Sequence, residues 1–391
     1  MNKQVPSRLF IFAGEPSGDL HGSHLIKALR KHLPHALLDG VPGPKMRIEK
    51  MQGLFSMEDF EVMGFSDVIL ALPKLYRQFY KIHAHILATK PDAVILIDYP
   101  GFNLRMAKKL RQSGYSGKII HYISPSVWAW GRHRVKDMAN TLDALLTIFP
   151  FESACFSDTS LNVTYVGNPL SEYINKHPYD DQWRQNLGIA PDCHLTALFP
   201  GSRRSEIERN LPIILDATSK LKEQNPQMLF GISCTNPITQ AHIESIAKRY
   251  PKHLQSALHF IPKQYTYELM RDSRTAIAKS GTVTLELALH QRPTIVIYKL
   301  TFLNRCYGKY VLKVNLPHYC IVNILAEKRI FPEIIESGLT PQNLFEKFNR
   351  LNSEGEIRSE CIQNCRQITS LLGNINASGN AAKAILELFS C

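Results

Sequence analysis

Short runs of aliphatic and β-branched residues alternate with longer stretches of helical pattern through most of the chain. This alternation is typical of βαβ units, and therefore of parallel sheets with helices on both faces. It occurs in two series separated by a polar connection. The apolar runs of the first series and then of the second lie at residues 9–13, 93–97, 118–123, 144–148 and 163–166, and at 194–199, 228–232, 276–278 and 294–298. We therefore expect an α/β protein with two Rossmann-like, doubly wound domains.

The connection between the two series contains Gly167, Asn168 and Pro169, which suit a hinge better than a strand. The predicted boundaries are 1–168 for the first domain, 169–370 for the second, and 371–391 for a C-terminal helix. We expect that helix to pack back on the first domain or on a partner subunit. In two domains of this kind, ligands bind where the carboxyl ends of both sheets face each other across a cleft. Residues directly after strands are therefore the first candidates for function.

The charge balance points to an anionic partner. The 391 residues suffice for two or three domains and carry a formal net charge of +12, with 46 Lys and Arg against 34 Asp and Glu. Such an excess favours nucleic acid, an anionic membrane or phosphorylated small molecules. Composition does not distinguish these three classes.

Several protein classes are disfavoured by simple patterns. No apolar stretch approaches the roughly 20 residues that cross a bilayer, and the apolar run that ends at Ala13 is too short for an export signal. The eight cysteines form no CxxC pair, and the 15 histidines show no HExxH spacing. We therefore expect reduced thiols in a cytoplasmic protein and no metal site.

A polar turn at residues 14–19 follows the first predicted strand and opens the first helix. Backbone N–H groups at such a turn can face an anion or a sugar hydroxyl. The GxGxxG spacing is absent and the acidic side chains would repel a pyrophosphate, so a sugar fits better than a dinucleotide. The alternative is a tight turn capped by Ser17 or Asp19. The candidate residues are Gly14, Glu15, Ser17, Gly18 and Asp19.

Asp98 ends the strongly apolar run at residues 93–97. An Asp that leaves a buried strand into a cleft can have a raised pKa and act as a general base toward a substrate hydroxyl. Alternatively, it only caps the next helix. One strand further on, Ser124 and Trp128 lie in a loop with two of the three tryptophans. These rings either line a site for a sugar or acyl chain or anchor the loop in the core.

Two turns of the second series suit a phosphorylated ligand. Gly201, Ser202 and Arg203 join a strand to a helix, and together they offer backbone donors, a helix N-terminus and a guanidinium group. Ser280, Gly281 and Thr282 follow a later strand and provide a second phosphate contact, with Glu286 one turn further on to accept ribose hydroxyls. The alternatives are a helix start with solvated arginines, and Ser280 as an N-cap with a solvated Glu286.

Two basic and aromatic segments, residues 72–81 and 299–313, contain no acidic residue. A helix with basic and aromatic faces is typical of an interfacial membrane binder, although an ordinary core-facing helix with a solvated face fits equally well. The candidate membrane residues are Lys74, Tyr76, Arg77, Lys81, Arg305, Tyr307, Lys309 and Lys313.

Taken in order, these motifs resemble those of the lipid-A-disaccharide synthase family. Members of this family are glycosyltransferases of the GT-B architecture. The resemblance covers nearly the entire chain. It is carried by residues 13–19, 97–100, 121–130, 200–203 and 280–282.

The resemblance implies condensation of UDP-2,3-diacylglucosamine with 2,3-diacylglucosamine 1-phosphate, with inversion, at the inner face of the cytoplasmic membrane. It implies no cofactor and no metal ion. Asp98 would take the proton from the acceptor 6-hydroxyl, Arg203 would face the diphosphate with help from Ser280 and Thr282, and Glu286 would hold the ribose. The residues at 14–19 would belong to the acceptor domain. A homodimer is compatible with the resemblance, which leaves the oligomeric state open.

The sequence departs from the family pattern at four places. Pro16 stands where Ala is common, and Gly101 replaces a second Asp, which leaves Asp98 as the only carboxylate of its motif. Asn168 replaces a frequent His, so a hinge histidine has no counterpart here. Only Asn323 is retained from a Ser-Leu-Pro-Asn stretch, and we expect it at the donor site.

Two other functions are compatible with parts of the sequence. A UDP-N-acetylglucosamine 2-epimerase uses the same scaffold, but it needs no surface for acyl chains. A nucleic-acid-binding protein would explain the net charge. However, the basic residues form no recognisable module, and Glu15, Asp19 and Asp98 would oppose a phosphate backbone. We therefore expect a glycosyltransferase that binds no nucleic acid.

Overall fold

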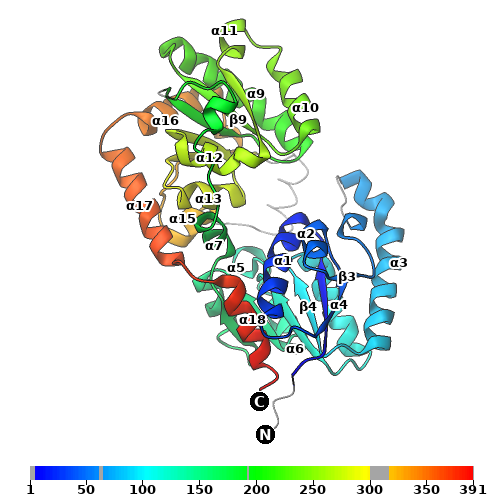
Figure 1. Ribbon diagram of the computed structural model, residues 1–391. Helices are drawn as coiled ribbons and strands as arrows, with labels where there is room; N and C mark the ends of the chain where they lie inside the picture. The colour runs from blue at the N-terminus through cyan, green and yellow to red at the C-terminus, as the bar shows by residue number, and fades with distance from the viewer. Residues whose placement is uncertain (1–4, 61–64, 192, 300–316, 391) are drawn as a thin grey trace. The chain divides into compact units, whose positions relative to one another are not determined.

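The computed structural model describes residues 5–60, 65–191, 193–299 and 317–390. The chain divides into two compact units (Figure 1). Unit 1 comprises Met1–Glu172 together with Asn374–Cys391, and unit 2 comprises Tyr173–Gly373.

Unit 1 is built on a seven-stranded parallel sheet with the order β3-β2-β1-β4-β5-β6-β7. The order reverses between β1 and β4, and this is the position where doubly wound sheets bind ligands. The strands are β1 Arg8–Ala13, β2 Leu37–Val41, β3 Gln52–Gly53, β4 Ala93–Ile97, β5 Lys118–Tyr122, β6 Ala144–Thr147 and β7 Asn162–Tyr165.

Helices cover both faces of this sheet, so each central strand is buried on two sides. Alternate residues of β1 separate accordingly: Leu9 and Ile11 join one core, and Phe10 and Phe12 the other. The helices and 3₁₀ turns are α1 Pro16–Arg30, α2 Pro44–Ile48, η1 Met57–Asp59, α3 Phe65–Thr89, α4 Pro100–Gln112, α5 Val127–Trp130, α6 Arg134–Thr141, η2 Pro150–Phe156 and α18 Ala377–Glu387, with α7 Pro169–Asn175 running into unit 2.

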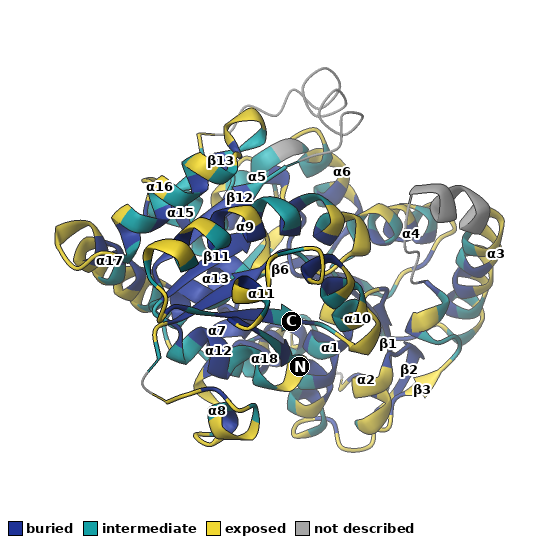
Figure 2. Ribbon diagram, turned by 90° about the horizontal axis from the view of Figure 1, so that it is seen from above, coloured by how far each residue is buried: buried dark blue, intermediate teal, exposed yellow. Residues whose placement is uncertain are grey.

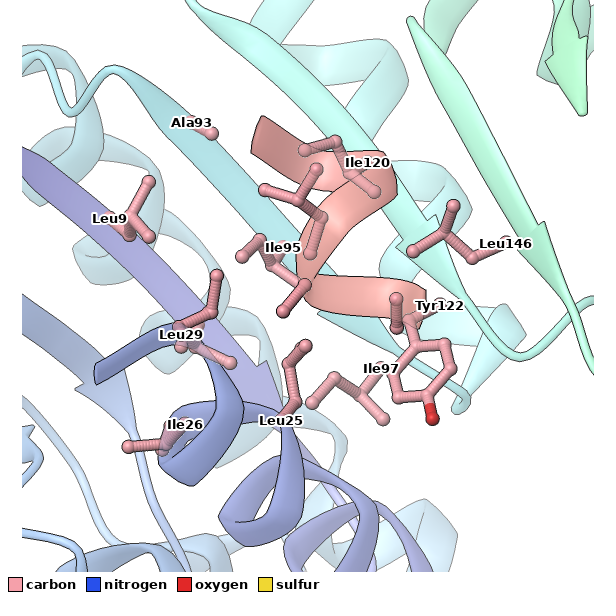
Figure 3. Packing of buried hydrophobic residues seen from close by; sticks show 14 of the residues in the cluster. Leu9, Leu25, Ile26, Leu29, Ala93, Ile95, Ile97, Ile120, Tyr122 and Leu146 are labelled. Atoms are coloured by element: carbon pink, nitrogen blue, oxygen red, sulfur yellow. The ribbon is translucent and has the colours of Figure 1, made fainter. Parts of the chain in front are cut away.

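The C-terminal helix α18 completes one of the two cores of unit 1. Figure 3 shows Leu25 and Leu29 of α1 close to Leu9 of β1 and Ile95 of β4, with the pale red α18 packed on the same face. Residues Ala381, Ala382 and Ile385 of α18 are fully buried in this cluster. Small residues on α18 permit its close approach to the sheet.

Unit 2 is built on a six-stranded parallel sheet with the order β10-β9-β8-β11-β12-β13, which reverses between β8 and β11. Its strands are β8 Leu195–Phe199, β9 Leu229–Cys234, β10 Leu258–Pro262, β11 Thr275–Lys279, β12 Thr294–Tyr298 and β13 Glu333–Ile335. Its helices and 3₁₀ turns are α8 Trp183–Asn186, α9 Arg204–Gln224, α10 Pro237–Ala247, α11 Lys252–Gln255, η3 Lys263–Tyr265, α12 Thr266–Asp272, α13 Thr282–Leu289, α15 Ile321–Ala326, η5 Glu336–Gly338, α16 Pro341–Asn352 and α17 Glu356–Leu372.

The prediction of two doubly wound parallel sheets is confirmed. Figure 2 shows mainly buried strands in dark blue and the outward faces of helices such as α17 in yellow. The apolar runs did not predict β2, which carries the polar Asp39 and also Gly40. A Cβ at Gly40 would lie 2.1 Å from the Ile11 carbonyl oxygen, so this strand requires glycine to approach β1. Among the described helices, none has both the length and the hydropathy needed to cross a membrane.

Candidate functional site

Asp98 lies directly after β4 in a strained turn. Its φ angle is +48° and that of Tyr99 is +45°, so two consecutive residues adopt the left-handed conformation that side chains disfavour. The Asp98 N–H donates to the Tyr122 carbonyl at 2.9 Å, and Pro100 starts α4 immediately after the turn. Ile123 at the end of the neighbouring β5 also has a positive φ, +71°. Backbone strain therefore gathers at the carboxyl ends of β4 and β5.

Asn103 holds this turn in place. Its Nδ2 donates to the carbonyl oxygens of Ile97, at 3.2 Å, and of Asp98, at 2.6 Å, and its side chain is fully buried. The amide thereby ties the first turn of α4 to the last residue of β4. We did not single out Asn103 from the sequence; the signal available was an Asn five residues after a strand-end Asp.

The environment of Asp98 suits a proton acceptor. Burial raises the pKa of its carboxyl group above the usual value, and the Tyr99 backbone N–H, which favours the ionised form, offsets this only in part. A carboxylate with a raised pKa is a stronger base. Gly101 stands where the family pattern has a second Asp. The space beside it is open, because a Cβ at Gly101 would meet nothing within 4 Å.

The turn after β1 lies against the Asp98 turn. A Cβ at Gly14 would lie 2.8 Å from the Tyr99 ring, and one at Gly18 would lie 3.7 Å from the Ile97 carbonyl oxygen. Glu15 is exposed, and its charge adds to the effect of burial in raising the pKa of Tyr99. Ser17 is exposed in the first turn of α1. The structure therefore brings these four predicted residues to the edge of the sheet that carries Asp98.

Asp19 has a different environment from its neighbours in the motif. It is 3% exposed, and its two carboxylate oxygens accept the backbone N–H groups of Lys45, at 2.9 Å, and Met46, at 3.0 Å. It therefore satisfies the start of α2. The alternative prediction for Asp19 was that it caps its own turn. Asp19 does act as a cap, but for α2.

The loop after β5 carries the other two predicted residues of unit 1. Ser124 is buried and its Oγ donates to the Pro125 carbonyl at 3.1 Å. Trp128 is half-buried, and its ring meets Phe151 edge to face, with the centroids 5.5 Å apart. Both residues lie at the carboxyl end of β5, beside the strained Ile123.

Glu152, which the sequence interpretation missed, lies in η2 after the next strand, β6. It is 2% exposed. Burial raises its pKa to about 7, although its Oε2 accepts the N–H groups of Ile148 and Phe149 at 3.1 and 3.0 Å. The only sequence feature that could have pointed to Glu152 is its place in Pro-Phe-Glu, directly after a predicted strand.

In unit 2, the predicted phosphate loop follows β8. Gly201 has a φ of +130°, and a Cβ there would lie 2.6 Å from the Cβ of Glu206. The Glu206 Oε2 accepts the N–H groups of Ser202, at 3.1 Å, and Arg203, at 3.4 Å. The Arg203 side chain is exposed. A carboxylate of the chain itself thus lies at the predicted anion site.

The second predicted phosphate turn follows β11. The Ser280 Oγ donates to the Tyr319 carbonyl at 2.8 Å, and the side chain is 8% exposed. Gly281 and Thr282 are exposed at the start of α13, with Thr282 in its first position. Lys279, the last residue of β11, places its Nζ 3.1 Å from the Glu206 Oε1. This ion pair connects the two predicted turns.

Glu286 lies one turn into α13 and is not simply solvated. Its Oε1 accepts the Tyr267 hydroxyl at 3.2 Å, and burial raises its pKa. The Tyr267 ring also lies against the His290 ring, with the centroids 5.4 Å apart. Tyr267 was not identified from the sequence.

Asn323 is a structural residue in this arrangement. Its Nδ2 donates to the Phe331 carbonyl and to Glu333, and its Oδ1 accepts the N–H groups of Ile330 and Phe331. These four hydrogen bonds use the full capacity of a side-chain amide. Asn323 could therefore contact the UDP-sugar, as predicted, only if some of these hydrogen bonds were broken.

The described part of the predicted membrane surface is an exposed face of α3. Tyr76 is 65% exposed and donates its hydroxyl proton to the Tyr80 hydroxyl at 3.1 Å. A groove of about 580 Å³ lies beside them and is lined by Phe55, Asp59, Pro73, Lys74, Arg77, Gln78 and Lys81. Lys74 pairs with Asp59 at 2.9 Å. The other candidates, Arg305, Tyr307, Lys309 and Lys313, lie outside the described residues.

Two doubly wound units with polar turns at the carboxyl ends of their central strands define a protein of the GT-B class. The fold resembles that of a putative UDP-N-acetylglucosamine 2-epimerase from Listeria monocytogenes, with a TM-score of 0.65, 15% identity, and coverage of 98% of this chain and 95% of that one. Within the described residues, no group of three His, Cys, Asp or Glu side chains is placed to hold a metal ion.

The chain belongs to the lipid-A-disaccharide synthetase family, whose model matches residues 9–386. It is 38% identical over 388 residues to the lipid-A-disaccharide synthase of Chlamydia trachomatis serovar D, covering 99% of this chain and 63% of that protein. The chain is also 32% identical over 383 residues to the lipid-A-disaccharide synthase of Myxococcus xanthus. That match covers 98% of this chain and 98% of the relative. The chain thus spans less than two thirds of the length of its chlamydial relative.

Proposed function

We propose that this protein condenses UDP-2,3-diacylglucosamine with 2,3-diacylglucosamine 1-phosphate to give the β-1,6-linked disaccharide 1-phosphate and UDP. Family membership supports this reaction. The observation that carries it is the Asp98 carboxylate, which is held in a strained turn at the strand-order reversal of unit 1 and has a raised pKa.

The first half of the reaction is a proton transfer coupled to attack. Asp98 takes the proton of the acceptor 6-hydroxyl, and the oxygen forms a bond to the anomeric carbon as the bond to the UDP oxygen breaks. Attack from the opposite face inverts the configuration. Asn103 contributes by fixing the backbone of Asp98, because a base must lie within hydrogen-bond reach of the proton that it abstracts.

The second half is stabilisation of the departing UDP, which carries away the electron pair of the broken bond. Arg203 and the backbone N–H groups at the start of α13 supply positive charge for the diphosphate. Glu286, oriented by Tyr267, accepts the ribose hydroxyls. No step in this scheme requires a metal ion.

We further propose that the protein works as a peripheral protein on the inner face of the cytoplasmic membrane, where acylated substrates reside. The exposed aromatic and basic residues of α3 support this location: Tyr76 and Tyr80 are 65% and 41% exposed, and Lys74, Arg77 and Lys81 line the neighbouring groove. Amphipathic helices of this composition bind the headgroup region of anionic membranes.

One experiment tests the proposed reaction. The purified chain is incubated with the two acylated precursors in detergent micelles, and disaccharide and UDP are followed by mass spectrometry. A parallel sample contains UDP-N-acetylglucosamine alone. Stoichiometric formation of disaccharide and UDP is expected only when both precursors are present. Conversion of UDP-N-acetylglucosamine to its 2-epimer, without disaccharide formation, would instead identify an epimerase.

A further inference from the structure

The Glu206 carboxylate contacts the backbone of the loop after β8. Its Oε2 accepts two consecutive backbone N–H groups, from Ser202 and Arg203, and its Oε1 forms an ion pair with Lys279 at 3.1 Å. Two convergent N–H groups and an ammonium group are the donors that proteins commonly present to phosphate. The chain therefore supplies its own anion to a set of phosphate-binding groups.

Helix capping explains only part of this arrangement. Glu206 is the third residue of α9, and a Glu at that position commonly accepts the N–H of the residue before the helix. Capping does not require Lys279, which comes from the end of β11. Of the pair, Lys279 is 28% and Glu206 16% exposed at the side chain, so a ligand can reach both groups.

The position of Lys279 connects the ion pair with the second predicted phosphate turn. A Cβ at Gly281 would lie 4.0 Å from the Lys279 Nζ, so the ammonium group lies beside the start of α13. The pairing with Lys279 and the N–H groups of Ser202 and Arg203 hold the pKa of Glu206 below its usual value despite partial burial. Glu206 is therefore ionised when the site holds no ligand.

We propose that Glu206 is an internal substitute for the donor diphosphate, and that Lys279 moves from Glu206 to the diphosphate when a nucleoside diphosphate binds. The inference rests on the proposed function, because it assigns two further residues to the donor site. In the empty site, Glu206 balances the charge of Lys279. After the reaction, Glu206 competes for Lys279 and favours release of UDP.

The test compares binding of UDP, UMP and uridine to the full chain by calorimetry. Lys279→Met should weaken UDP binding about tenfold or more, which corresponds to one charge-assisted hydrogen bond, and should leave uridine binding unchanged. Glu206→Gln retains the capping interaction, since Gln also serves at this position, and removes only the charge. It should strengthen UDP binding about threefold to tenfold and slow UDP release.

A double variant tests the transfer itself. In the Lys279→Met background, Glu206→Gln should increase UDP affinity less than it does in the wild type. The reason is that Glu206 then has no ammonium group to hold away from the diphosphate. An undiminished gain would mean that Glu206 only repels the ligand, and would overturn the proposal. Unchanged UDP binding in Lys279→Met, or weaker binding in Glu206→Gln, would also overturn it.

Controls separate these outcomes from misfolding and from failure of the proposed function. Lys252→Met removes an exposed lysine of the same unit and should leave UDP binding unchanged. If Lys279→Met lowers the unfolding temperature, Lys279→Gln replaces it. Wild-type protein that binds UDP but forms no disaccharide would refute the proposed reaction alone, whereas active wild-type protein with unaffected variants would refute only the role of the ion pair.

Discussion

The side-chain amide of Asn103 donates a 2.6 Å hydrogen bond to the backbone carbonyl of Asp98. Because Asp98 and Tyr99 both have positive φ angles, the turn stores strain that this contact must help to offset. Asn103→Ala should destabilise the protein by about 1–3 kcal/mol, the usual cost of a lost buried hydrogen bond. It should also lower kcat at least tenfold while UDP affinity is retained. Unchanged kcat in a folded variant would show that the turn needs no such support.

Asp98→Asn separates catalysis from stability. Turnover should fall about 100-fold or more, the range expected for loss of a general base, with UDP binding intact. Because burial raises the pKa of Asp98, its charged form is disfavoured in the folded state, and activity should rise as pH increases through that raised pKa. The Asn variant should therefore unfold at a higher temperature than wild type at neutral pH. Near-normal turnover would eliminate Asp98 as the base.

Arg203→Ala should weaken use of the donor much more than use of the acceptor. Arg203 is exposed in the loop that joins β8 to α9, so we expect the KM for the UDP-sugar to rise about tenfold or more when its charge is removed. Arg204→Ala is the matched control, because Arg204 pairs with Glu208 on the same helix. Equal losses for donor and acceptor would contradict a diphosphate contact.

Membrane attachment should depend on the groove beside α3. The triple change Lys74→Glu, Arg77→Glu and Lys81→Glu should release the protein from anionic vesicles in a sedimentation assay. Added salt should weaken attachment of the wild type, because exposed charges are screened within about 8–10 Å at physiological ionic strength. A triple change with the same charge difference at Lys27, Lys136 and Lys383, exposed residues of unit 1, should have little effect. Salt-resistant attachment would indicate that hydrophobic insertion dominates.

Glu152 should make the stability of unit 1 depend on pH. Its pKa rises from the usual 4.5 to about 7 on burial, so the folded state binds this proton more tightly than the unfolded state. The resulting stabilisation is complete below pH 4.5 and is lost as the pH rises toward about 7. Glu152→Gln should remove this pH dependence, as measured by denaturant unfolding between pH 4.5 and 7. An identical slope in the variant would contradict the raised pKa.

The sequence predicted the central strands well because parallel strands buried on both faces are continuous apolar runs. Strands β1, β4 and β8 are of this kind. The short edge strands β3 and β13 were not predicted, since Gln52–Gly53 and Glu333–Ile335 lack such a run. Their place in the sheet depends on neighbours that are distant in the chain.

Asp98 and Arg203 were chosen from the sequence because they follow predicted strands, and the structure places them after β4 and β8. Roles that depend on tertiary partners were not predictable. Asp19 and Asn323 resemble ligand-binding residues in the sequence, but their polar atoms are engaged by the backbone of other segments. Conversely, Lys279 was not a candidate in the sequence, and its ion pair with Glu206 becomes visible only in the fold.

The return of the chain to unit 1 at Asn374 has a consequence for synthesis. Helix α18 is held there by Ser378, whose N–H and hydroxyl donate to the buried carboxylate of Glu172, and its Ile385 fills the core on one face of the sheet. Unit 2, Tyr173–Gly373, is one contiguous segment, so all of it is synthesised before the last segment of unit 1. Unit 1 is begun first and finished last. Until α18 emerges, the nascent chain exposes an incomplete apolar face, which is the period of greatest risk for misassembly.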